Sequence, residues 1–241
     1  DVTGTTVFDP NTNRFFFRPG PIFAHIVLAD EINRTSPKVQ SALLEAMAEK
    51  QTTVDNRTRK LDELFLVIAT QNPLDLAGTF PLPSAQLDRF LFKIRMVHIA
   101  PEHELEILRN FRAIKHASDR DDLPRVTRGE ILDARRVVGD EIYVHPNVHE
   151  ALVGISQRTR HDPRILQGAS TRSLVLAVPA LQARALSQHR NYVSADDVYA
   201  LADRIFTHRL EFAPGIDDRE AVVRECCAGE LERLAQASMQ R

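Results

Sequence analysis

The fold of this chain is decided by a short apolar stretch that ends in two acids, His25-Ile26-Val27-Leu28-Ala29-Asp30-Glu31. A strand that is apolar on both faces belongs inside a parallel sheet. Open parallel sheets bind ligands at the carboxyl ends of their strands, so both carboxylates are expected at a ligand-binding edge. There one carboxylate can hold Mg²⁺ through its water shell, and the other can orient or deprotonate an attacking water. Because acids commonly follow strands, a purely structural interpretation of this stretch alone stays open.

The segments that follow predict more of the same layer. Residues 64–69 predict a second buried strand, and residues 91–96 a third. Between the first two strands, Ser36 and Pro37 form a helix start, in which a capping side chain precedes a first-turn proline. Strand, helix and strand in this order indicate an α/β class fold with a parallel sheet. Asn72 follows the second strand, where its amide would reach a γ-phosphate or its water; the alternative is a loop asparagine that supports a turn.

Outside this layer the pattern changes. Residues 7–17 predict two short strands around a turn at residues 9–13. After Pro101 no further strand pattern is convincing, and the apolar spacing predicts helices. We therefore expect an α/β core over residues 1–117 with a hairpin insert at 1–20, a linker at 118–125 and a helical domain at 126–241.

The composition is that of an ordinary globular protein, with 43% hydrophobic and 27% charged residues. A net charge of −2 provides no basic field, so no nucleic-acid partner is expected. The longest apolar stretch, residues 174–181, contains Pro179 and is too short to cross a bilayer, and no secretion signal opens the chain. The adjacent Cys226 and Cys227 are expected to be reduced packing residues. These features predict a cytoplasmic protein without membrane insertion.

Four motifs in a fixed order make the interpretation specific: LADEINR at 28–34, ATQNP at 69–73, GTFPLP at 78–83 and AQLDRF at 85–90. In this combination the sequence resembles the MoxR family of AAA+ ATPases. Four further segments fit the same family pattern: FRPGPIFA at 17–24, QSALLEAM at 40–47, GASTR at 168–172 and HRL at 208–210. The resemblance covers essentially the whole chain. It implies an AAA+ P-loop-type parallel sheet core followed by an α-helical lid domain.

The resemblance also implies a role for each matching position. Asp30 and Glu31 match the Walker B motif, with Asp30 on Mg²⁺ and Glu31 as the catalytic carboxylate. Asn72 matches the sensor-1 residue that positions the hydrolytic water. Arg89 matches the arginine finger, which reaches the neighbouring subunit's nucleotide, and Arg172 matches the sensor-2 arginine, which contacts the γ-phosphate of its own subunit. The structural alternatives are an ordinary salt bridge of Arg89 with Asp88 or another acid, and a helix-surface charge for Arg172.

The sequence departs from the family pattern in three places. MoxR proteins usually have an acid at the position of Ser84 and a proline at the position of Thr171. The larger departure is that no Walker A run, G-x-x-x-x-G-K-[ST], is present. In the family's sheet order the strand that leads into Walker A lies between the strands near residues 65 and 91, so the parallel sheet is expected to be incomplete. We expect an N-terminally truncated sequence that is inactive without Walker A.

For the whole protein, the resemblance implies a ring homo-oligomer, expected to be a hexamer, that couples Mg-ATP hydrolysis to chaperone-like remodelling or maturation of protein complexes. ATP and Mg²⁺ are the implied cofactors, and the implied partner is a protein client, with a von Willebrand A domain protein as one candidate. The alternatives are a magnesium-chelatase-like motor subunit and a non-catalytic, P-loop-less regulator of AAA+ rings. The N-terminal hairpin resembles an insert that can face the central pore, but we expect Phe15, Phe16 and Phe17 to pack.

Overall fold

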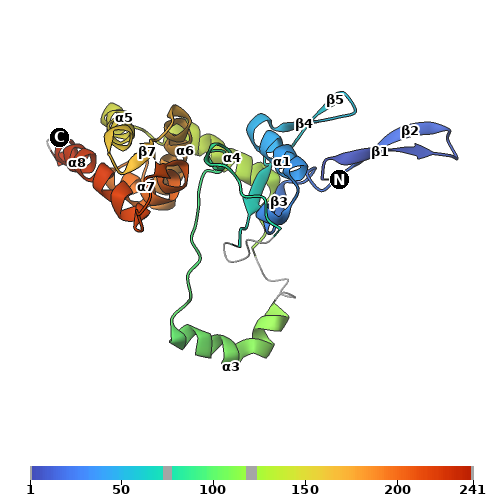
Figure 1. Cartoon of the computed structure of the whole chain (residues 1–241), viewed down its shortest axis with the longest axis horizontal. Helices are drawn as coiled ribbons and strands as arrows, with labels where there is room; N and C mark the ends of the chain where they lie inside the picture. The colour runs from blue at the N-terminus through green and yellow to red at the C-terminus, as the bar shows by residue number, and fades with distance from the viewer. Residues whose placement is uncertain (1, 73–77, 118–123, 240–241) are drawn as a thin grey trace.

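The computed structural model of the chain describes residues 2–72, 78–117 and 124–239. An α/β unit and a mostly helical unit lie next to each other (Figure 1). The hairpin of β1 (Gly4–Asp9) and β2 (Arg14–Pro19) projects from the α/β unit at one end of the molecule, and the C-terminal helix α8 (Arg219–Met239) lies at the other end (Figure 1). The α/β class and the helical unit that follows it agree with the predicted fold.

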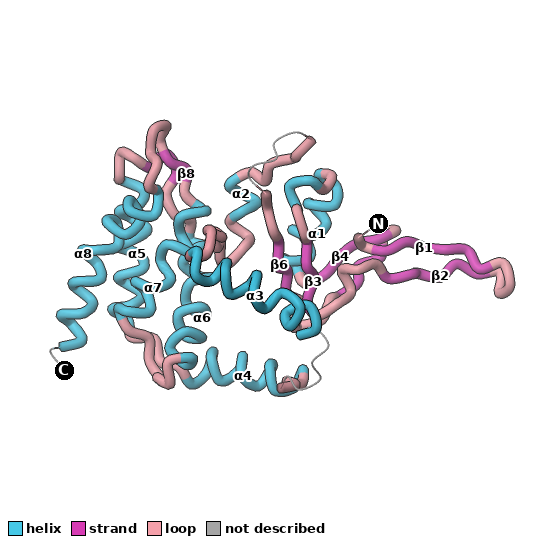
Figure 2. The backbone as a smooth tube through the Cα atoms, turned by 90° about the horizontal axis from the view of Figure 1, so that it is seen from below, coloured by secondary structure: helices cyan, strands magenta, loops and turns pink. Residues whose placement is uncertain are grey.

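The α/β unit is built on two parallel strands, β3 (Ile26–Ala29) and β6 (Leu66–Ala69). They lie side by side with the helix α1 (Pro37–Glu49) next to them (Figure 2). The strands pair in register, with Ala29 beside Ala69. This pairing brings the residues that follow the two strands to one edge of the sheet, as the sequence predicted.

One face of this sheet packs on α1. Val27 and Val67 of the strands pack against a buried apolar cluster that includes Leu43 and Leu44 of the helix. The helix begins directly after Ser36, at Pro37, where the sequence placed its start. It is followed by Lys50, whose backbone adopts the left-handed conformation that commonly ends helices.

The other face of the sheet is open among the described residues. Its side chains are half exposed or more: Ile26 62%, Leu28 66%, Leu66 53% and Ile68 50%. The prediction of strands buried on both faces is therefore wrong for this chain. The predicted third strand at residues 91–96 is also wrong, since the segment runs to α3 (Pro101–Ala117) without strand pairing (Figure 1). A strand exists only beside a neighbour, and no strand among the described residues pairs with this segment.

Two antiparallel hairpins lie beside each other at one side of the sheet (Figure 1). The β1–β2 hairpin turns where the sequence predicted it. The second hairpin, β4 (Gln51–Val54) and β5 (Arg57–Lys60), was not anticipated. Its two turn residues, Asp55 and Asn56, have φ of 50° and 58°, as a two-residue hairpin turn requires. The hairpins contact each other, because the Arg59 guanidinium lies 3.6 Å from the centre of the Phe17 ring.

The aromatic side chains of the first hairpin divide between packing and exposure. Phe17 is half-buried and lies edge-on to Phe23, with ring centres 5.6 Å apart. Phe15 is 73% exposed and Phe16 is 49% exposed. Phe8 is also exposed, and its ring centre lies 5.1 Å from that of Phe15. The packing prediction is confirmed for Phe17 and wrong for Phe15 and Phe16.

The helical unit surrounds a second apolar cluster. Its helices are α4 (Arg128–Glu141), α5 (Pro146–His161), α6 (Thr171–Ser187), α7 (Ala195–Phe206) and α8. It also contains an antiparallel pair of short strands, β7 (Ile165–Gln167) and β8 (Glu211–Phe212), which corrects the prediction of helices alone. Strands this short produce no periodic pattern in a sequence. Cys226 and Cys227 are free and buried, as predicted.

The helix α3 stands away from both units in Figure 1, and its side chains are exposed up to Phe111. Residues 118–123 of the predicted linker lie outside the described residues. Within the described parts of the chain, no helix combines the length and the apolar character needed to cross a membrane. The division into a core at 1–117, a linker at 118–125 and a lid at 126–241 stays a prediction.

Candidate active site

The ends of β3 and β6 place the two predicted Walker B acids beside a threonine. The hydroxyl of Thr70 donates a hydrogen bond to Asp30 Oδ1 at 2.5 Å and accepts one from the Glu31 N–H at 2.8 Å. The backbone of Thr70 is also engaged, since its N–H donates to Ala29 and its carbonyl accepts from Ile32, each at 3.0 Å. Thr70 therefore fixes the turn that carries both acids.

Glu31 occupies an unusual backbone conformation. Its φ of 48° and ψ of 52° lie in the left-handed region, which side-chain-bearing residues rarely adopt. Such a conformation costs on the order of 1–3 kcal/mol and persists only where other contacts hold it. Arg34, in the short 3-10 helix η1 (Ile32–Arg34), forms an ion pair with Glu31 Oε2 at 3.1 Å. The Glu31 side chain is 39% exposed, so this pair is screened by solvent and the carboxylate is accessible.

Asn72 is exposed in the loop after β6. Its carbonyl accepts a hydrogen bond from Nδ2 of Asn33 at 3.3 Å. Asn33 is buried, and its own carbonyl accepts from the Phe80 N–H at 2.7 Å. Nε2 of the buried Gln40 in turn donates to the Phe80 carbonyl at 2.9 Å. The elements η1 and α1 thus anchor the chain on both sides of residues 73–77, which lie outside the described residues.

Arg89 follows the short helix α2 (Ser84–Leu87) and is half-buried. Its guanidinium donates to the carbonyl of Leu44 in α1 at 2.8 Å. The neighbouring acid, Asp88, forms an ion pair at 3.0 Å with Arg209 of the helical unit. The structure thus places the Arg89 guanidinium against α1 of its own chain.

Arg172 is exposed in the first turn of α6. The helix is capped by Ser170, whose hydroxyl accepts from the Ser173 N–H at 3.2 Å. A helix N-terminus carries partial positive charge, so an arginine here adds to a field that favours anions. The loop before the helix is held closely: a Cβ at Gly168 would lie 2.6–2.7 Å from atoms of Arg160, whose guanidinium donates to the carbonyl of the next loop residue at 2.8–3.0 Å.

The structure therefore gathers some predicted site residues and separates others. Asp30 and Glu31 share one sheet edge, and Asn72 lies in the loop that leaves it. Arg89 and Arg172 lie on two segments that are joined through Asp88. Sequence reasoning missed the supporting roles of Thr70 and Asn33, and it considered Asp88 only as a salt-bridge partner of Arg89, whereas Asp88 pairs with Arg209. Thr70, Asn33 and Asp88 all lie inside the quoted motifs, and the hydroxyl next to a strand end that faces two acids was the signal for Thr70.

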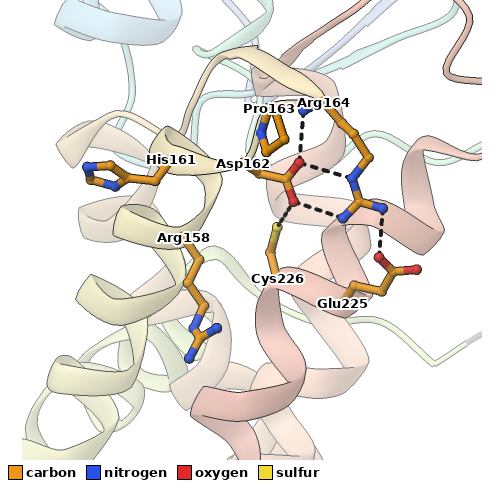
Figure 3. Close-up of a pocket in the computed structure, with 7 residues that line it drawn as sticks. All are labelled: Arg158, His161, Asp162, Pro163, Arg164, Glu225 and Cys226. Atoms are coloured by element: carbon orange, nitrogen blue, oxygen red, sulfur yellow. Dashed lines mark hydrogen bonds and ion pairs between the residues drawn. The ribbon is translucent and has the colours of Figure 1, made fainter.

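A pocket on the helical unit lies between the end of α5 and α8 (Figure 3). Arg164 donates to both oxygens of Asp162 and to Glu225, and the hydrogen bonds from Arg164 to Asp162 lower the pKa of this acid to about 2. Burial raises the pKa of the Cys226 thiol to about 11, so it is not a nucleophile at neutral pH. Arg158 points away from this group in Figure 3 and pairs with Glu230 at 3.0 Å. The charged groups satisfy one another, which indicates a structural network.

Comparison with known proteins gives independent matches. Residues 1–92 match the model of the ATPase family associated with various cellular activities (AAA), and residues 157–226 match the AAA lid domain. The chain is 44% identical to the uncharacterized protein YeaC of Bacillus subtilis, an alignment that covers 93% of this chain and 71% of YeaC. It is 34% identical to Chaperone MoxR1 of Mycobacterium tuberculosis, over 87% of this chain and 57% of MoxR1. A candidate ATPase from Cytophaga hutchinsonii has a similar crystal structure, with a TM-score of 0.82, 32% identity, and coverage of 97% of this chain and 72% of that one.

These matches agree with the motifs and with the geometry. The AAA model covers the strands that carry Asp30, Glu31 and Asn72, and the lid model covers the start of α6 that carries Arg172. A third relative, Protein MoxR of Methylorubrum extorquens, is 28% identical over 85% of this chain and 66% of its own length. The chain belongs to the MoxR family of AAA+ ATPases.

Proposed function

We propose that Asp30, Glu31 and Asn72 form the hydrolytic edge of a Mg-ATP site. The observation that carries the proposal is the pair of acids held by Thr70 where two parallel strands end. Glu31 would take a proton from the attacking water, and Asn72 would orient that water. Asp30 would hold the magnesium ion through its water shell. Phosphoryl transfer needs mainly such positioning and charge neutralisation.

The groups at this edge suit a magnesium ion that arrives with its nucleotide. Mg²⁺ keeps several waters and is usually held by one or two carboxylates together with phosphate oxygens. Asp30 provides one exposed carboxylate, of which Oδ1 already accepts from Thr70. Among the described residues, no group of three or more His, Cys, Asp or Glu side chains is placed to hold a metal alone. When bound, the ion would neutralise charge on the reacting phosphate.

The two arginines would complete the charge stabilisation from opposite sides. Arg172 sits at the positive end of α6 and would contact the γ-phosphate bound to its own subunit. Arg89 would act on the nucleotide of the adjoining subunit in a ring. In the isolated chain its guanidinium is held by a carbonyl of α1, so it would have to exchange this neutral acceptor for a phosphate. A guanidinium binds the oxygens of a phosphate more strongly than it binds a backbone carbonyl oxygen, and this difference favours the exchange.

The backbone cradle for the phosphates would come from sequence outside these 241 residues. No G-x-x-x-x-G-K-[ST] run occurs among them. The open face of β3 and β6, and the segment at 91–100, which forms no strand, support this proposal because they offer apolar surface and strand edges to a neighbour. A longer protein that joins these residues to a Walker A motif is called the full-length protein below. The 241-residue chain alone is expected to bind ATP poorly and to hydrolyse little.

The proposed output is chaperone-like remodelling or maturation of protein complexes by a ring of identical subunits, in the cytoplasm. The name of the relative Chaperone MoxR1 supports this class of activity. The exposed rings of Phe8, Phe15 and Phe16 on the projecting hairpin support contact with apolar segments of a protein client. A protein with a von Willebrand A domain remains the proposed candidate among partners.

Glu31→Gln in the full-length protein tests this function. The amide keeps the size of the side chain but cannot take a proton, so ATP turnover should fall by about 10²–10⁴-fold while ATP binding is retained. Steady-state phosphate release and titration with a fluorescent ATP analogue measure the two quantities. Asp30→Asn should weaken the binding of Mg²⁺, so that turnover requires a higher Mg²⁺ concentration. A Glu31→Gln protein that hydrolyses ATP at the parent rate would overturn the assignment.

The same titration on the 241-residue chain separates this proposal from a non-catalytic regulator of AAA+ rings. A Mg-ATP enzyme completed by a Walker A segment predicts weak binding in the 241-residue chain and turnover in the full-length protein. Absence of turnover in the full-length protein favours the regulator. Micromolar affinity with steady turnover in the 241-residue chain would show that the phosphates are cradled in another way.

A further inference from the structure

We propose that Asp88 is a positioning residue that locks the helical unit, called the lid below, to the α/β unit. In this way it would set Arg89 and Arg172 in one geometry. A nucleotide contact made by Arg172 on the lid would then be transmitted to Arg89, the arginine offered to the next subunit. This inference rests on the proposed function and adds to it a route of communication between sites.

The side chain of Asp88, at the end of α2, contacts the 3-10 helix η2 (Thr207–Arg209) and the start of α6. Its Oδ1 pairs with Arg209 Nε at 3.0 Å and accepts from the Ser173 hydroxyl at 3.2 Å. Its Oδ2 accepts from the Ser170 hydroxyl at 3.2 Å. Ser170 and Ser173 flank Arg172 in the first turn of α6, and Asp88 directly precedes Arg89. One carboxylate therefore connects the segments that carry the two arginines.

Burial makes this junction a strong one. The Arg209 side chain is 1% exposed and the Asp88 side chain is 18% exposed. Burial lowers the pKa of Arg209, and the Asp88 carboxylate opposes that shift, so the acid compensates the buried charge. Removal of one partner from a buried ion pair leaves an uncompensated charge, which the surrounding structure resists.

The chain after Asp88 is attached to the lid at further points. The Arg209 guanidinium donates to the Phe90 carbonyl at 2.6 Å, and the Lys93 N–H donates to the Arg204 carbonyl at 3.1 Å. Nε2 of His208 lies 3.0 Å from the Phe90 carbonyl. Burial, with Arg209 and Lys93 nearby, lowers the pKa of His208 to about 4 although the Phe90 carbonyl and Asp88 oppose the shift. His208 is therefore neutral at pH 7 and can donate this hydrogen bond.

Apolar packing in the same segment spans both units. Leu87 and Phe90 pack against the α/β cluster, whereas Leu91 packs against the cluster of the helical unit. Close-packed interiors transmit displacements instead of absorbing them. A shift of the lid therefore has to move residues 87–91 and the Arg89 that they contain.

A second contact between the two units, among the described residues, is of a different kind. Arg128 pairs with Asp62 at 3.2 Å, and Arg135 donates to the Glu63 carbonyl at 2.7 Å. The Arg128 side chain is 46% exposed, so solvent screens this pair. The Arg128–Asp62 contact also lies at the start of α4, which is far in the sequence from the segments that contain the two arginines. The junction at Asp88 is thus the one suited to positioning.

Asp88→Asn in the 241-residue chain tests the lock. Spin labels at Ser41 on α1 and Gln157 on α5, both exposed, report the distance distribution between the two units. We expect a narrow distribution in the parent and a clearly broader one in Asp88→Asn, because the ion pair with Arg209 is lost.

The milder variant Ser173→Ala keeps the acid, so it should broaden the distribution less, and it guards against a folding defect in Asp88→Asn. Asp162→Asn is the matched control: its side chain is 15% exposed and pairs with Arg164 inside the lid, so the distribution should stay narrow. An unchanged distribution in folded Asp88→Asn and Ser173→Ala overturns the proposal.

The coupling is tested in the full-length protein. A misplacement of about 1 Å at a reacting group can cost on the order of 100-fold, so Asp88→Asn should lower kcat by about 10- to 100-fold. Affinity for ADP, which lacks the γ-phosphate that both arginines would contact, should stay within about twofold of the parent, whereas a general loss of lid structure would weaken it. Asp162→Asn should retain kcat.

Parent-like kcat in an Asp88→Asn protein with a broadened distance distribution overturns the coupling. An inactive parent would refute the proposed function, and the distance measurement would still decide whether Asp88 locks the lid.

Discussion

Thr70 shows how one side chain organises two acids at the residue scale. A hydroxyl can donate and accept at once, and Thr70 uses both capacities, towards the Asp30 carboxylate and from the Glu31 N–H. The left-handed backbone of Glu31 depends on such support, because residues with a side chain avoid this region. Valine has nearly the shape of threonine and neither capacity, so the two residues differ here in hydrogen bonding alone.

We expect Thr70→Val to lower ATP turnover of the full-length protein by about 10- to 100-fold, because the turn that aims Glu31 loses its anchor. The free energy of unfolding should fall by only about 0.5–1.5 kcal/mol, since these hydrogen bonds lie at an exposed site. Steady-state ATPase assays and urea denaturation measure the two effects. Thr70→Ser keeps the hydroxyl and should retain most of the turnover. Equal turnover in the Val and Ser variants would show that the hydroxyl positions nothing.

At the scale of elements, the sequence was informative wherever the signal was local. The start of α1 at Pro37 followed from a capping residue and a first-turn proline, because a helix makes its hydrogen bonds within itself. A strand depends on a partner that the sequence does not identify. Residues 91–96 have the apolar composition of a strand and form none, whereas the polar β4–β5 hairpin forms without apolar alternation.

The candidate site divides in the same way. The gathering of Asp30, Glu31 and Asn72 near one sheet edge followed from parallel strands that end together. The support that Asn33 gives to the Asn72 loop, and the link from Asp88 to the lid, join segments far apart in the sequence, so no local pattern announces them. The exposure of Phe15 and Phe16 was missed for a related reason. Alternation predicts which side chains share a face of a hairpin, but not whether anything covers that face.

The prediction at the scale of elements concerns the β1–β2 hairpin. The double variant Phe15→Ala/Phe16→Ala should weaken binding of an unfolded protein to the full-length protein by about tenfold or more, because it removes exposed aromatic contact area. Stability should change by no more than about 0.5 kcal/mol, as is usual at exposed positions. Fluorescence anisotropy of labelled casein measures binding, and thermal unfolding measures stability.

Phe17→Ala is the matched control for the hairpin. Phe17 contacts Phe23 and the Arg59 guanidinium, so its loss should destabilise the protein without removing exposed aromatic surface. Casein binding should therefore persist in folded Phe17→Ala protein. Parent-like binding by the double variant would contradict a role of the hairpin in client contact.

At the scale of the whole molecule, the two arginines are predicted to serve different subunits. Arg172 belongs to the helical unit at the start of α6, and Arg89 belongs to the segment that leaves α2. If the chain forms a ring, Arg172 completes the site of its own chain and Arg89 completes the neighbour's. A site would then need Glu31 and Arg172 from one subunit and Arg89 from the next, which a mixing experiment can separate.

Arg89→Ala and Glu31→Gln full-length proteins should each be inactive alone and should regain ATPase activity when subunits are mixed. In a mixed ring, a Glu31→Gln subunit supplies its intact Arg89 to the site of an Arg89→Ala neighbour, which retains Glu31 and Arg172. An arginine finger contributes on the order of 10³–10⁵ in rate in favourable systems, so both the loss and the recovery should be measurable by phosphate release. In the control, Arg172→Ala replaces Arg89→Ala in the mixture. No recovery is expected there, because a neighbour cannot repair an arginine that acts within its own subunit. Recovery with Arg172→Ala but not with Arg89→Ala would exchange the two assignments, and recovery with neither would refute the action of Arg89 across the interface.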